Sequence, residues 1–289
     1  MKEKYYLGID IGTYETKGVL VNLDGKVIII TGGAGFLGEK HAEAIAQYGG
    51  TPVLLDLDQD RIEEVTSKIK DLYSITSIGI SVDITNEQKI NSAVSKILKK
   101  FSKIDGLINN AAVNPKVDLN QESNFSRLEH FPIETWSQEI NVGLTGAFLS
   151  SKIIGPIIAN NPSGGSIINI SSDLGIIAPN QSLYLVNGLR SDQQPVKPIT
   201  YSVIKSGLIG LSRYLSTYWP TLVRSNVICP GGIENNQDDD FKERIQSLIP
   251  MGRMGKSTEL QGAVVFLLSD ASSYINGAVL SVDGGRTAW

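Results

Sequence analysis

Residues 26–50 read KVIIITGGAGFLGEKHAEAIAQYGG, and this stretch decides the fold. Residues 26–31 contain a run of β-branched side chains, which is typical of a strand buried on both faces. Residues 37–49 have a helical pattern that ends at a pair of glycines, a helix-stop signal. Between them, the glycine-rich residues 31–38 allow the backbone to approach a phosphate at the start of the helix. The stretch therefore predicts a strand, a phosphate-binding loop and a helix; the plainer reading is a tight strand–helix turn.

The same alternation continues along the rest of the chain. Strands that alternate with helices form parallel βαβ units, so we expect an α/β fold with a doubly wound parallel sheet. Further strands are predicted at residues 51–56, 77–83, 104–110, 164–172, 224–232 and 278–285, and further helices at residues 60–73, 86–101, 136–154 and 199–219.

Composition narrows the class of protein. The 289 residues are 41% hydrophobic and 19% charged, which fits a soluble globular chain, and a net charge of −4 without a basic cluster argues against nucleic-acid binding. With Cys229 as the single cysteine and only His41 and His130 as histidines, we expect no disulfide and no metal site. No leader sequence or membrane-spanning run is evident, so a cytoplasmic location without a membrane partner is expected.

Acidic and small residues at predicted strand ends indicate the nucleotide. Asp56 ends a strand eighteen residues after Gly38, where a carboxylate accepts hydrogen bonds from a ribose 2′-OH and repels a 2′-phosphate. The loop lacks Arg and Lys, so we predict NAD in preference to NADP. Asp83 ends the next strand and either borders the adenine or serves as a turn residue. The motif NNAA at residues 109–112 ends a predicted strand, and its small residues let the backbone approach the cofactor.

A second set of residues points to acid–base chemistry. Tyr201 and Lys205 are four positions apart, on one face of a predicted helix. The phenol has a reference pKa near 10, and a nearby ammonium can lower it by roughly 1–3 units, which would suit a general acid or base. Ser171 and Ser172 follow a predicted strand at the sheet edge where ligands bind, and Asn141 interrupts a helix otherwise suited to packing. Taken singly, each has a plainer reading as a surface or packing residue.

Together these motifs resemble the short-chain dehydrogenase/reductase family from about residue 25 to the C-terminus. The resemblance implies a Rossmann-type sheet of seven parallel strands with helices on both faces, and a hydride-transfer active site. In the family's order, the chain carries TGGAGFLG at 31–38, Asp56, VDIT at 82–85, NNAA at 109–112, INVGLTGAF at 140–148, NISS at 169–172, YSVIK at 201–205, NVICPGG at 226–232 and VDGG at 282–285.

The resemblance also implies roles for individual residues. Tyr201 would donate or accept the proton, and Ser172 would hydrogen-bond the substrate oxygen. Lys205 would hold the nicotinamide ribose and lower the pKa of Tyr201, and Asn141 would order a helix kink and a water relay to Lys205. The residues expected to contact NAD are Gly32, Gly35, Phe36, Leu37, Gly38, Asp56, Asp83, Ile84, Asn110, Ala111, Tyr201, Lys205, Pro230, Gly231 and Ile233.

Three features depart from the family pattern. Phe36 follows Gly35, which gives the loop spacing typical of two-domain sugar-nucleotide epimerases and dehydratases, although the chain is expected to form the single-domain type. Ile233 and Glu234 replace the usual Thr, which removes one hydroxyl contact to the cofactor amide. Ser172 and Tyr201 are 29 positions apart, a longer separation than is usual, so residues 183–200 are interpreted as an insertion.

The insertion is polar and contains two prolines, which predicts a surface loop of restricted motion. We expect it to form a wall of the substrate pocket. Its candidates for contacting polar substrate groups are Arg190, Gln193, Gln194 and Lys197. With residues 249–256 and the tail 283–289, the insertion resembles the flagellin-modification dehydrogenases of sialic-acid-like sugar biosynthesis, which implies a sugar or sugar-phosphate substrate.

The sequence thus predicts an NAD-dependent oxidoreductase of alcohols and ketones. The alternatives are a sugar epimerase or dehydratase, which returns the hydride to its substrate, and a non-catalytic NAD-binding protein. Apolar residues on the helices at 136–154 and 199–219, among them Leu208, Ile209, Leu211, Leu215 and Trp219, exceed one stripe, so these helices are expected either to bury a second face in a homodimer or homotetramer or to face their own core.

The first 24 residues resemble a fragment of a different family. Residues 5–28 are similar to the opening hairpin of a carbohydrate kinase, in which Asp10 would bind Mg²⁺ and Gly12, Thr13 and Lys17 would approach ATP phosphates. The second phosphate loop that such a kinase needs is absent, so no ATP site is expected. We therefore predict a β-hairpin extension over residues 1–24, followed by the dehydrogenase domain over residues 25–289.

Overall fold

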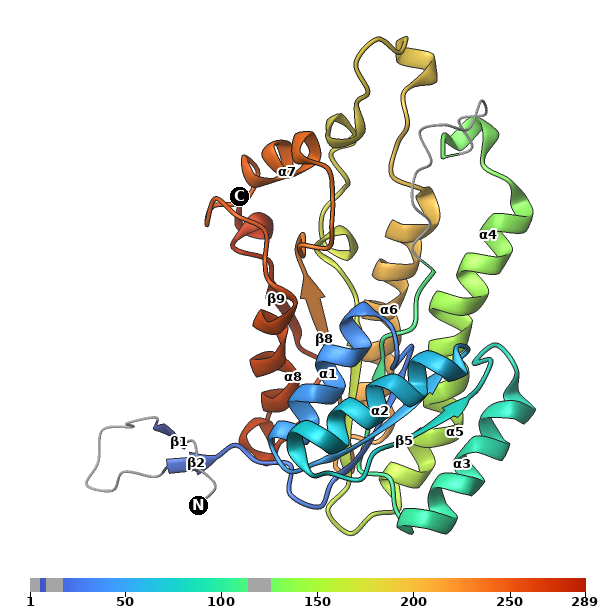
Figure 1. Cartoon of the computed structure of the whole chain (residues 1–289), viewed down its shortest axis with the longest axis vertical. Helices are drawn as coiled ribbons and strands as arrows, with labels where there is room; N and C mark the ends of the chain where they lie inside the picture. Colours follow the sequence, from blue (N-terminus) through green and yellow to red (C-terminus); the bar gives the residue numbers. More distant parts are fainter. Residues whose placement is uncertain (1–5, 9–17, 114–125) are drawn as a thin grey trace.

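Seven parallel strands form the central sheet of the computed structural model, which describes residues 6–8, 18–113 and 126–289 (Figure 1). The strand order is β5-β4-β3-β6-β7-β8-β9, and every neighbouring pair is parallel. This confirms the predicted doubly wound sheet. The strands are β3 (Val27–Thr31), β4 (Thr51–Asp56), β5 (Ile78–Ser81), β6 (Gly106–Asn109), β7 (Gly165–Ile170), β8 (Val223–Pro230) and β9 (Val279–Val282).

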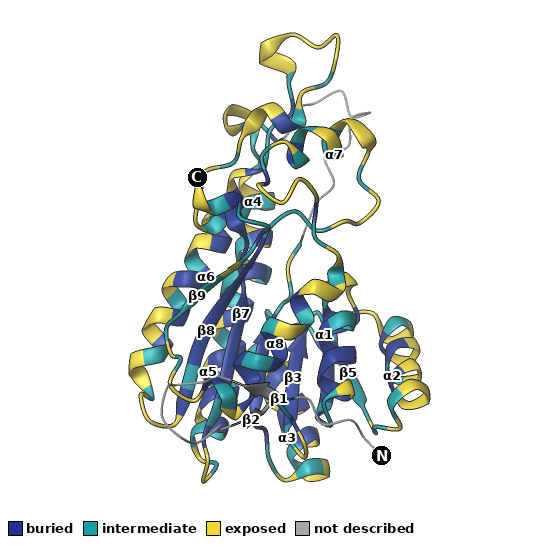
Figure 2. Ribbon diagram, turned by 90° about the vertical axis from the view of Figure 1, so that its left-hand side faces the viewer, coloured by how far each residue is buried: buried dark blue, intermediate teal, exposed yellow. Residues whose placement is uncertain are grey.

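Helices cover both faces of the sheet, and alternate residues of each strand point to opposite layers. In β3, Ile28 and Ile30 pack in one core with α1 and α8, whereas Val27 and Ile29 pack in the other core with α3 and α5. The dark blue strands of Figure 2 are buried on both sides. The helices are α1 (Phe36–Gln47), α2 (Gln59–Tyr73), α3 (Glu87–Phe101), α4 (Ile133–Ile140), α5 (Gly146–Ala159), α6 (Ile199–Tyr218), α7 (Asp239–Gln246) and α8 (Gln261–Leu268).

The chain changes winding direction at β3, because β4 and β6 pair with its opposite edges. Hydrogen bonds join the loops that follow β3 and β6 at this point. The Thr31 hydroxyl oxygen accepts from the backbone N–H groups of Asn110 and Ala111, at 3.1 and 3.2 Å. The Asn110 amide donates to the carbonyls of Thr31 and Gly32. Ligands of open α/β sheets bind outside the strand ends at such a crossover point.

The helix predicted at residues 136–154 is interrupted. A π-helical segment, Asn141–Thr145, separates α4 from α5, and its Gly143 lies against Ile204 of α6. In the described part of the chain, the one helical run long and apolar enough to cross a membrane is Ile133–Ala159, which the sequence reading did not single out. Since α5 packs on β6, β7 and α3, this run is a core helix.

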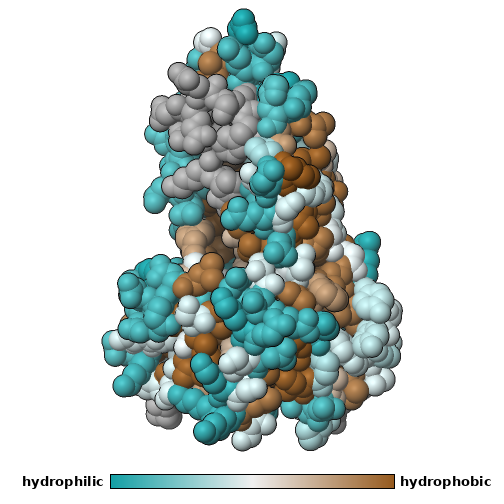
Figure 3. All heavy atoms as spheres, turned by 90° about the vertical axis from the view of Figure 1, so that its right-hand side faces the viewer, coloured by the Kyte–Doolittle hydropathy of each residue, from teal (hydrophilic) through white to brown (hydrophobic). Residues whose placement is uncertain are grey.

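The α6 residues expected to form a second apolar face mostly pack in the protein's own core. Leu208, Ile209 and Leu215 are buried, and Leu211 and Trp219 are partly buried against the core. The exposed apolar and aromatic side chains of these helices are different ones: Phe148 on α5 and Ile199, Val203, Tyr214 and Tyr218 on α6. Figure 3, which views the molecule from the side of α4, shows hydrophobic atoms over much of that face.

Before the sheet, β1 (Tyr6–Gly8) pairs antiparallel with β2 (Gly18–Leu20) in a separate two-stranded sheet. The connection between them, with Asp10, Gly12, Thr13 and Lys17, lies outside the described residues. The hairpin resembling a kinase therefore stays a prediction.

Burial of His41 in α1 makes the fold sensitive to acid. Its side chain is 0% exposed, neither ring nitrogen has a hydrogen-bond partner, and burial lowers the pKa of His41 from 6.5 to about 4. The unfolded chain therefore binds a proton that the folded chain refuses between these values, so this contribution is complete above pH 6.5 and is lost as the pH falls toward 4. The resulting decrease in the free energy of unfolding is on the order of 3 kcal/mol.

Urea unfolding at pH 7 and pH 4.5 tests the role of His41. The decrease in the free energy of unfolding between these pH values should be smaller for His41→Leu than for the natural chain. The exposed His130 provides the control: if His130→Leu reduced this decrease as much, burial would not be the cause.

Candidate active site

A cleft of about 770 Å³ lies at the carboxyl edge of the sheet. Its walls come from the segments that follow β3, β4, β5, β6, β7 and β8, and from the chain between β7 and α6. The volume is within the range of small-molecule and cofactor sites. The cleft runs from Asp56 and Asp83 at one end to Tyr201 and Lys205 at the other.

The glycine-rich loop forms the floor of this cleft beside α1. Gly32 has φ +61, and a Cβ there would lie 2.9 Å from the Ala111 Cα, so the position requires glycine. A Cβ on Gly38 would lie 2.1 Å from the Gly32 carbonyl oxygen, which explains why this glycine is needed although it does not line the cleft. Helix α1 begins at Phe36 with its N-terminal N–H groups beside the cleft, an arrangement suited to a phosphate.

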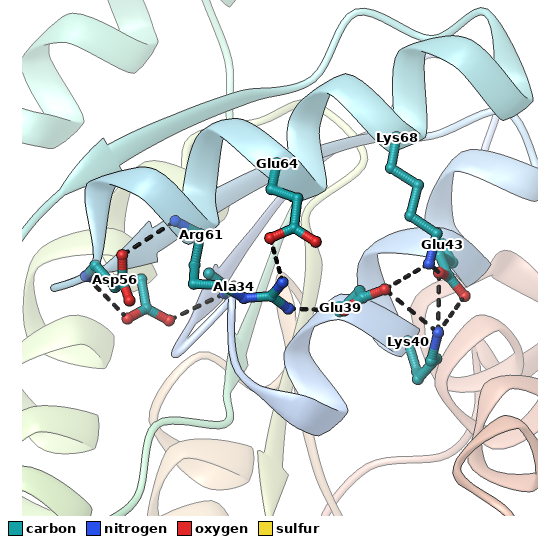
Figure 4. A network of polar contacts seen from close by, with 9 residues as sticks. Ala34, Glu39, Lys40, Glu43, Asp56, Arg61, Glu64 and Lys68 are labelled. Carbon is teal, nitrogen blue, oxygen red and sulfur yellow. Dashed lines mark hydrogen bonds and ion pairs between the residues drawn. The ribbon is translucent and has the colours of Figure 1, made fainter.

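Asp56 is held at the end of β4 by backbone donors. Its Oδ2 accepts from Ala34 N at 3.0 Å (Figure 4), and its Oδ1 accepts from Leu57 N at 2.7 Å and from Asp58 N at 3.4 Å. A carboxylate has about four acceptor positions, so these three bonds leave capacity for a hydroxyl donor. The carboxylate is thereby fixed against the glycine loop, at the position expected for a ribose contact.

The nearest arginine beyond Asp56 in the chain is occupied elsewhere. Arg61 donates to Glu64 and, at 3.1 Å, to Glu39 of α1, and Lys68 forms a further ion pair with Glu39 at 2.6 Å (Figure 4). Burial raises the pKa of Glu39, but the Lys68 hydrogen bond and the Lys40 and Lys68 charges prevail and lower it to about 2. These carboxylates hold Arg61 between α1 and α2, so its guanidinium is not available to bind a 2′-phosphate.

Asp83 both forms a turn and lines the cleft, so its two readings are compatible. Its Oδ1 accepts from the Thr85 hydroxyl at 2.7 Å and from Thr85 N at 2.9 Å. These hydrogen bonds lower the pKa of Asp83. Ile84, Asn110 and Ala111 line the same part of the cleft.

Three predicted catalytic side chains meet at the other end. Ser172, two positions after the end of β7, lies beside the phenol of Tyr201, and its Oγ donates to Asp173 Oδ1 at 2.7 Å. Lys205 lies one turn along α6, with its Nζ 5.6 Å from the centre of the Tyr201 ring, and donates to the Ile170 carbonyl at 2.9 Å. Burial, together with the charge of Lys197, lowers the pKa of Lys205 to about 8.

The sequence predicts that Lys205 lowers the pKa of Tyr201, and this prediction is wrong in the structure. Burial raises the pKa of the Tyr201 phenol; the Ser172 hydrogen bond opposes the rise and the Asp173 carboxylate adds to it. Tyr201 is only partly exposed, and the ammonium of Lys205 is directed to a backbone carbonyl. Desolvation therefore exceeds the expected electrostatic benefit.

Asn141 does not join this group. Its side chain is exposed and does not line the cleft, so the position gives no support to the predicted water relay to Lys205. The predicted interruption of the helix does begin at Asn141. The residues of this segment that pack against α6 are Gly143 and Leu144, and neither offers a polar side chain to Lys205.

A buried ion pair that the sequence reading missed supports the catalytic serine. Arg286 Nη1 lies 2.7 Å from Asp173 Oδ2, and the two side chains are only 6% and 4% exposed. The other carboxylate oxygen, Oδ1, accepts from Ser172 and from Leu174 N. Asp173 directly follows the NISS motif and Arg286 directly follows VDGG, so adjacency to the motifs was the available signal.

The insertion and α7 together cover the catalytic end of the cleft. Leu183 and Tyr184 of the insertion pack with Phe241 and Ile245 of α7 in a small separate core. Arg244 of α7 donates to the carbonyls of Ser182, Leu183 and Leu185. Helix α7 is capped by Asp238, whose side chain accepts from Phe241 N.

Of the four polar candidates in the insertion, only Lys197 lines the cleft. Arg190 is exposed and pairs with Asp192 at 3.1 Å. Gln194 holds the insertion together, since its amide bonds to Val186 and Leu189 backbone atoms. Gln193 is exposed at the end of a short 3-10 turn, Ser191–Gln193.

Most of the predicted site residues lie in one cleft, with Gly38 and Asn141 as the exceptions. Those lining it are Gly32, Gly35, Phe36, Leu37, Asp56, Asp83, Ile84, Asn110, Ala111, Ser172, Tyr201, Lys205, Pro230, Gly231 and Ile233. No group of three or more potential metal ligands occurs within residues 6–8, 18–113 and 126–289.

Comparison with known proteins assigns the chain to a group of enzymes. Residues 26–185 match the short chain dehydrogenase family, and residues 189–287 match the family described as enoyl-(acyl carrier protein) reductase. An NAD-dependent glycerol dehydrogenase of Listeria innocua is 30% identical over 92% of this chain and 95% of its own. A 3-oxoacyl-(acyl-carrier-protein) reductase of Thermotoga maritima is 29% identical over 92% of this chain and 99% of its own.

Two further matches bear on the predicted resemblance and on the fold. The post-translational flagellin modification protein A of Campylobacter coli is 28% identical over 91% of this chain and 98% of its own. The crystal structure of a short-chain type dehydrogenase/reductase from Mycobacterium marinum superimposes with a TM-score of 0.79 at 25% identity, over 93% of this chain and 98% of that chain.

Proposed function

This chain belongs to the short-chain dehydrogenase family and is an oxidoreductase acting on CH–OH groups, and from that premise we propose that it transfers a hydride between NAD and the alcohol or ketone of a sugar or sugar phosphate. The observation that carries the proposal is the contact of Ser172 with Tyr201, beside Lys205, at one end of a cleft whose other end holds the glycine loop and Asp56. The name of the Listeria innocua relative, a glycerol dehydrogenase, supports a polyol or sugar as the substrate class.

The nicotinamide cofactor fits the cleft on three observations. The glycine loop offers N–H groups at the start of α1, where a Cβ at Gly32 would meet the opposite loop. Asp56 retains acceptor capacity for a ribose hydroxyl. Pro230, Gly231 and Ile233 line the wall beside Lys205. The site residues listed for NAD are therefore proposed as its ligands, except Gly38, which acts through packing.

In the proposed mechanism each catalytic side chain has one task. NAD held in the cleft would supply the acceptor for the hydride that leaves the carbinol carbon of an alcohol. Tyr201 takes the hydroxyl proton during oxidation and returns it during reduction. Ser172, whose own proton is engaged by Asp173, accepts a hydrogen bond and so positions the phenol or the substrate hydroxyl. Lys205 holds its ammonium at the base of the site and orients the ribose.

Net production of NADH separates this proposal from its alternatives. The protein should be incubated with NAD and a panel of three- to six-carbon alditols, sugars and sugar phosphates, and the NADH absorbance followed. Continuous, substrate-dependent NADH formation is expected. Conversion of a sugar without net NADH would instead support an epimerase or dehydratase, and tight NAD binding without any conversion would support a non-catalytic binding protein.

Replacing Asp56 with asparagine should weaken the preference for NAD. The variant keeps the shape of the side chain but removes the charge that repels a 2′-phosphate, and hydrogen bonds to charged groups contribute about 1.5–3 kcal/mol. The ratio of kcat/KM with NAD to kcat/KM with NADP should therefore fall by at least about tenfold. Asp60→Asn, which changes an exposed carboxylate of α2 outside the cleft, should leave the ratio unchanged. An unaltered ratio in the Asp56 variant would contradict the assignment.

We also propose that the protein is a homodimer or homotetramer. The exposed Phe148, Val203, Tyr214 and Tyr218 on α5 and α6 support an interface on these helices. Light scattering of the purified protein tests the proposal, and a monomer at micromolar concentration would exclude it.

A further inference from the structure

Charged residues divide the cleft into two unlike ends. Asp56 and Asp83 are the charged side chains that line the end near β4 and β5. Lys197, Lys205 and Arg286 line the catalytic end, with Asp173 as the one carboxylate beside them in the described lining. Because Asp173 is paired with Arg286, the two lysines leave the catalytic end with an excess of positive charge.

Lys197 is the cation of this end without a partner. Its Nζ lies 3.8 Å from the centre of the Tyr201 ring, directly over the catalytic phenol. Its ammonium has no hydrogen bond or ion pair with any described residue, whereas that of Lys205 donates to Ile170. Burial lowers the pKa of Lys197 to about 8, the charges of Asp173 and Glu139 opposing the shift, so the side chain is mostly protonated at neutral pH.

Neither nearby carboxylate neutralises this lysine. Asp173 is committed to Arg286 and Ser172. Glu139 of α4 accepts from the hydroxyl of Thr200 and is not within ion-pair distance of Lys197. A largely buried ammonium that faces a cleft and has no acceptor is costly, and an anionic ligand is the partner that would relieve the cost.

The segment that carries Lys197 is built to hold it in place. Pro195 and Pro198 on either side are buried. The backbone N–H of Lys197 donates to the Gln181 side chain at 2.9 Å, and that of Val196 donates to Ser126. Anchoring of the backbone in this way places the Lys197 ammonium at a fixed position in the cleft. The side chain of Arg190, in contrast, lies at the exposed tip of the same insertion.

We propose that Lys197 is a substrate-recognition residue and that the substrate carries an anionic group, a carboxylate or a phosphate, within a few bonds of the reacting carbon. The inference rests on the proposed function and narrows its substrate class. The short separation of the ammonium from the Tyr201 ring sets the limit on distance: a substrate whose hydroxyl contacts the phenol brings only its nearest substituents to Lys197.

Matched substrates test the proposal. Steady-state oxidation with NAD should be compared for alditols of three to six carbons, for the corresponding aldonates, and for the corresponding alditol phosphates. The aldonate arm and the phosphate arm identify which anion is recognised. The natural enzyme should favour one anionic series over the neutral one by at least tenfold in kcat/KM, and equal values for all three series would overturn the proposal.

Variants of the insertion test the residue. Lys197→Met should lose about 10- to 100-fold in kcat/KM for the anionic substrate, mainly through KM, because the lost contact exists before and during reaction. Lys197→Arg should retain part of it. In Lys197→Met the ratio of kcat/KM for the anionic substrate to that for the neutral alditol should therefore fall by at least about tenfold, and Arg190→Met should behave as the natural enzyme. A Lys197→Met enzyme that lost kcat equally on neutral and anionic substrates, with a shifted pH profile, would show that Lys197 acts on Tyr201 and Lys205, and would refute the proposal.

A binding measurement keeps this inference separate from the proposed function. If no alcohol is oxidised, the proposed function fails, and the NADH-saturated protein is titrated by calorimetry with oxalate and with inorganic phosphate. Binding that Lys197→Met abolishes and Arg190→Met preserves would still support the anion site. Binding that is absent, or that is unaffected by Lys197→Met, would overturn it.

Discussion

Replacing Tyr201 with phenylalanine is expected to reduce kcat for alcohol oxidation by about 10²- to 10⁴-fold, the usual contribution of a positioned general acid or base. The substitution removes one hydroxyl from a partly buried ring, so packing against neighbouring residues is retained. NADH binding, measured by fluorescence, should change little, since only the proton-transfer group is lost. Stopped-flow or steady-state NADH formation provides the rate.

Tyr184 supplies the comparison, because it is the other tyrosine that lines the described cleft. Its ring packs against Phe241 of α7 with 5.8 Å between the ring centres, and burial raises the pKa of its phenol to about 12 with no serine hydroxyl to oppose the rise. Tyr184→Phe should therefore lose far less activity than Tyr201→Phe. A Tyr201→Phe enzyme with natural activity, or a greater loss in the Tyr184 variant, would mean that the assigned acid–base residue is wrong.

The direction of the Tyr201 shift also predicts how rate depends on pH. Burial raises the pKa of Tyr201 above its ordinary 10, so the neutral phenol dominates at pH 7. Reduction of a ketone needs this protonated form and should proceed at neutral pH without a loss caused by this group. Oxidation needs the deprotonated form, so its rate should increase as the pH rises through the alkaline range in which the stability of the fold allows measurement.

Replacing Arg286 with methionine should lower the free energy of unfolding by about 3–5 kcal/mol, because it leaves the buried carboxylate of Asp173 without its partner. For a chain of this size that corresponds to a decrease in Tm of roughly 6–10 °C. Ser172 shares the Asp173 carboxylate, so kcat should fall as well. Thermal or urea unfolding, with and without NADH, provides the measurement.

Two further variants isolate the cause of this destabilisation. In Arg286→Met combined with Asp173→Asn both charges are absent, so most of the stability should return. Arg253→Met breaks a different arginine–carboxylate pair, with Glu259, whose side chains are 44% and 41% exposed, and should destabilise the fold far less than Arg286→Met because water already screens this pair. If the double variant were as unstable as Arg286→Met alone, an unpaired buried charge would not explain the loss.

Local patterns were sufficient for the architecture and for much of the site. The run of β-branched residues at 26–31 predicted a fully buried strand, and β3 is buried at each position. Tyr201 and Lys205 share a face of α6 because their spacing matches the helical repeat. Ser172 follows a strand in a parallel sheet, and the ends of such strands converge on one edge.

Other expectations failed or stayed undecided because they depend on distant parts of the chain. Asn141 was placed in the catalytic group by its motif, but the π-helical segment directs Gly143 toward α6 and leaves Asn141 exposed. The pKa of Tyr201 was expected to fall because a lysine is near in sequence. It rises because the burial of the phenol, which no local pattern reports, is the larger effect.

The sequence by itself determined the α/β class, the order of the motifs and the identity of the Ser172, Tyr201 and Lys205 group, because strand and helix periodicity and short spacings are local properties. The tertiary structure decided which cation of the insertion reaches the cleft, and it joined Asp173 to Arg286 across 113 positions of chain. Burial and charge pairing depend on contacts between segments that are far apart in the sequence, and local sequence patterns do not specify those contacts.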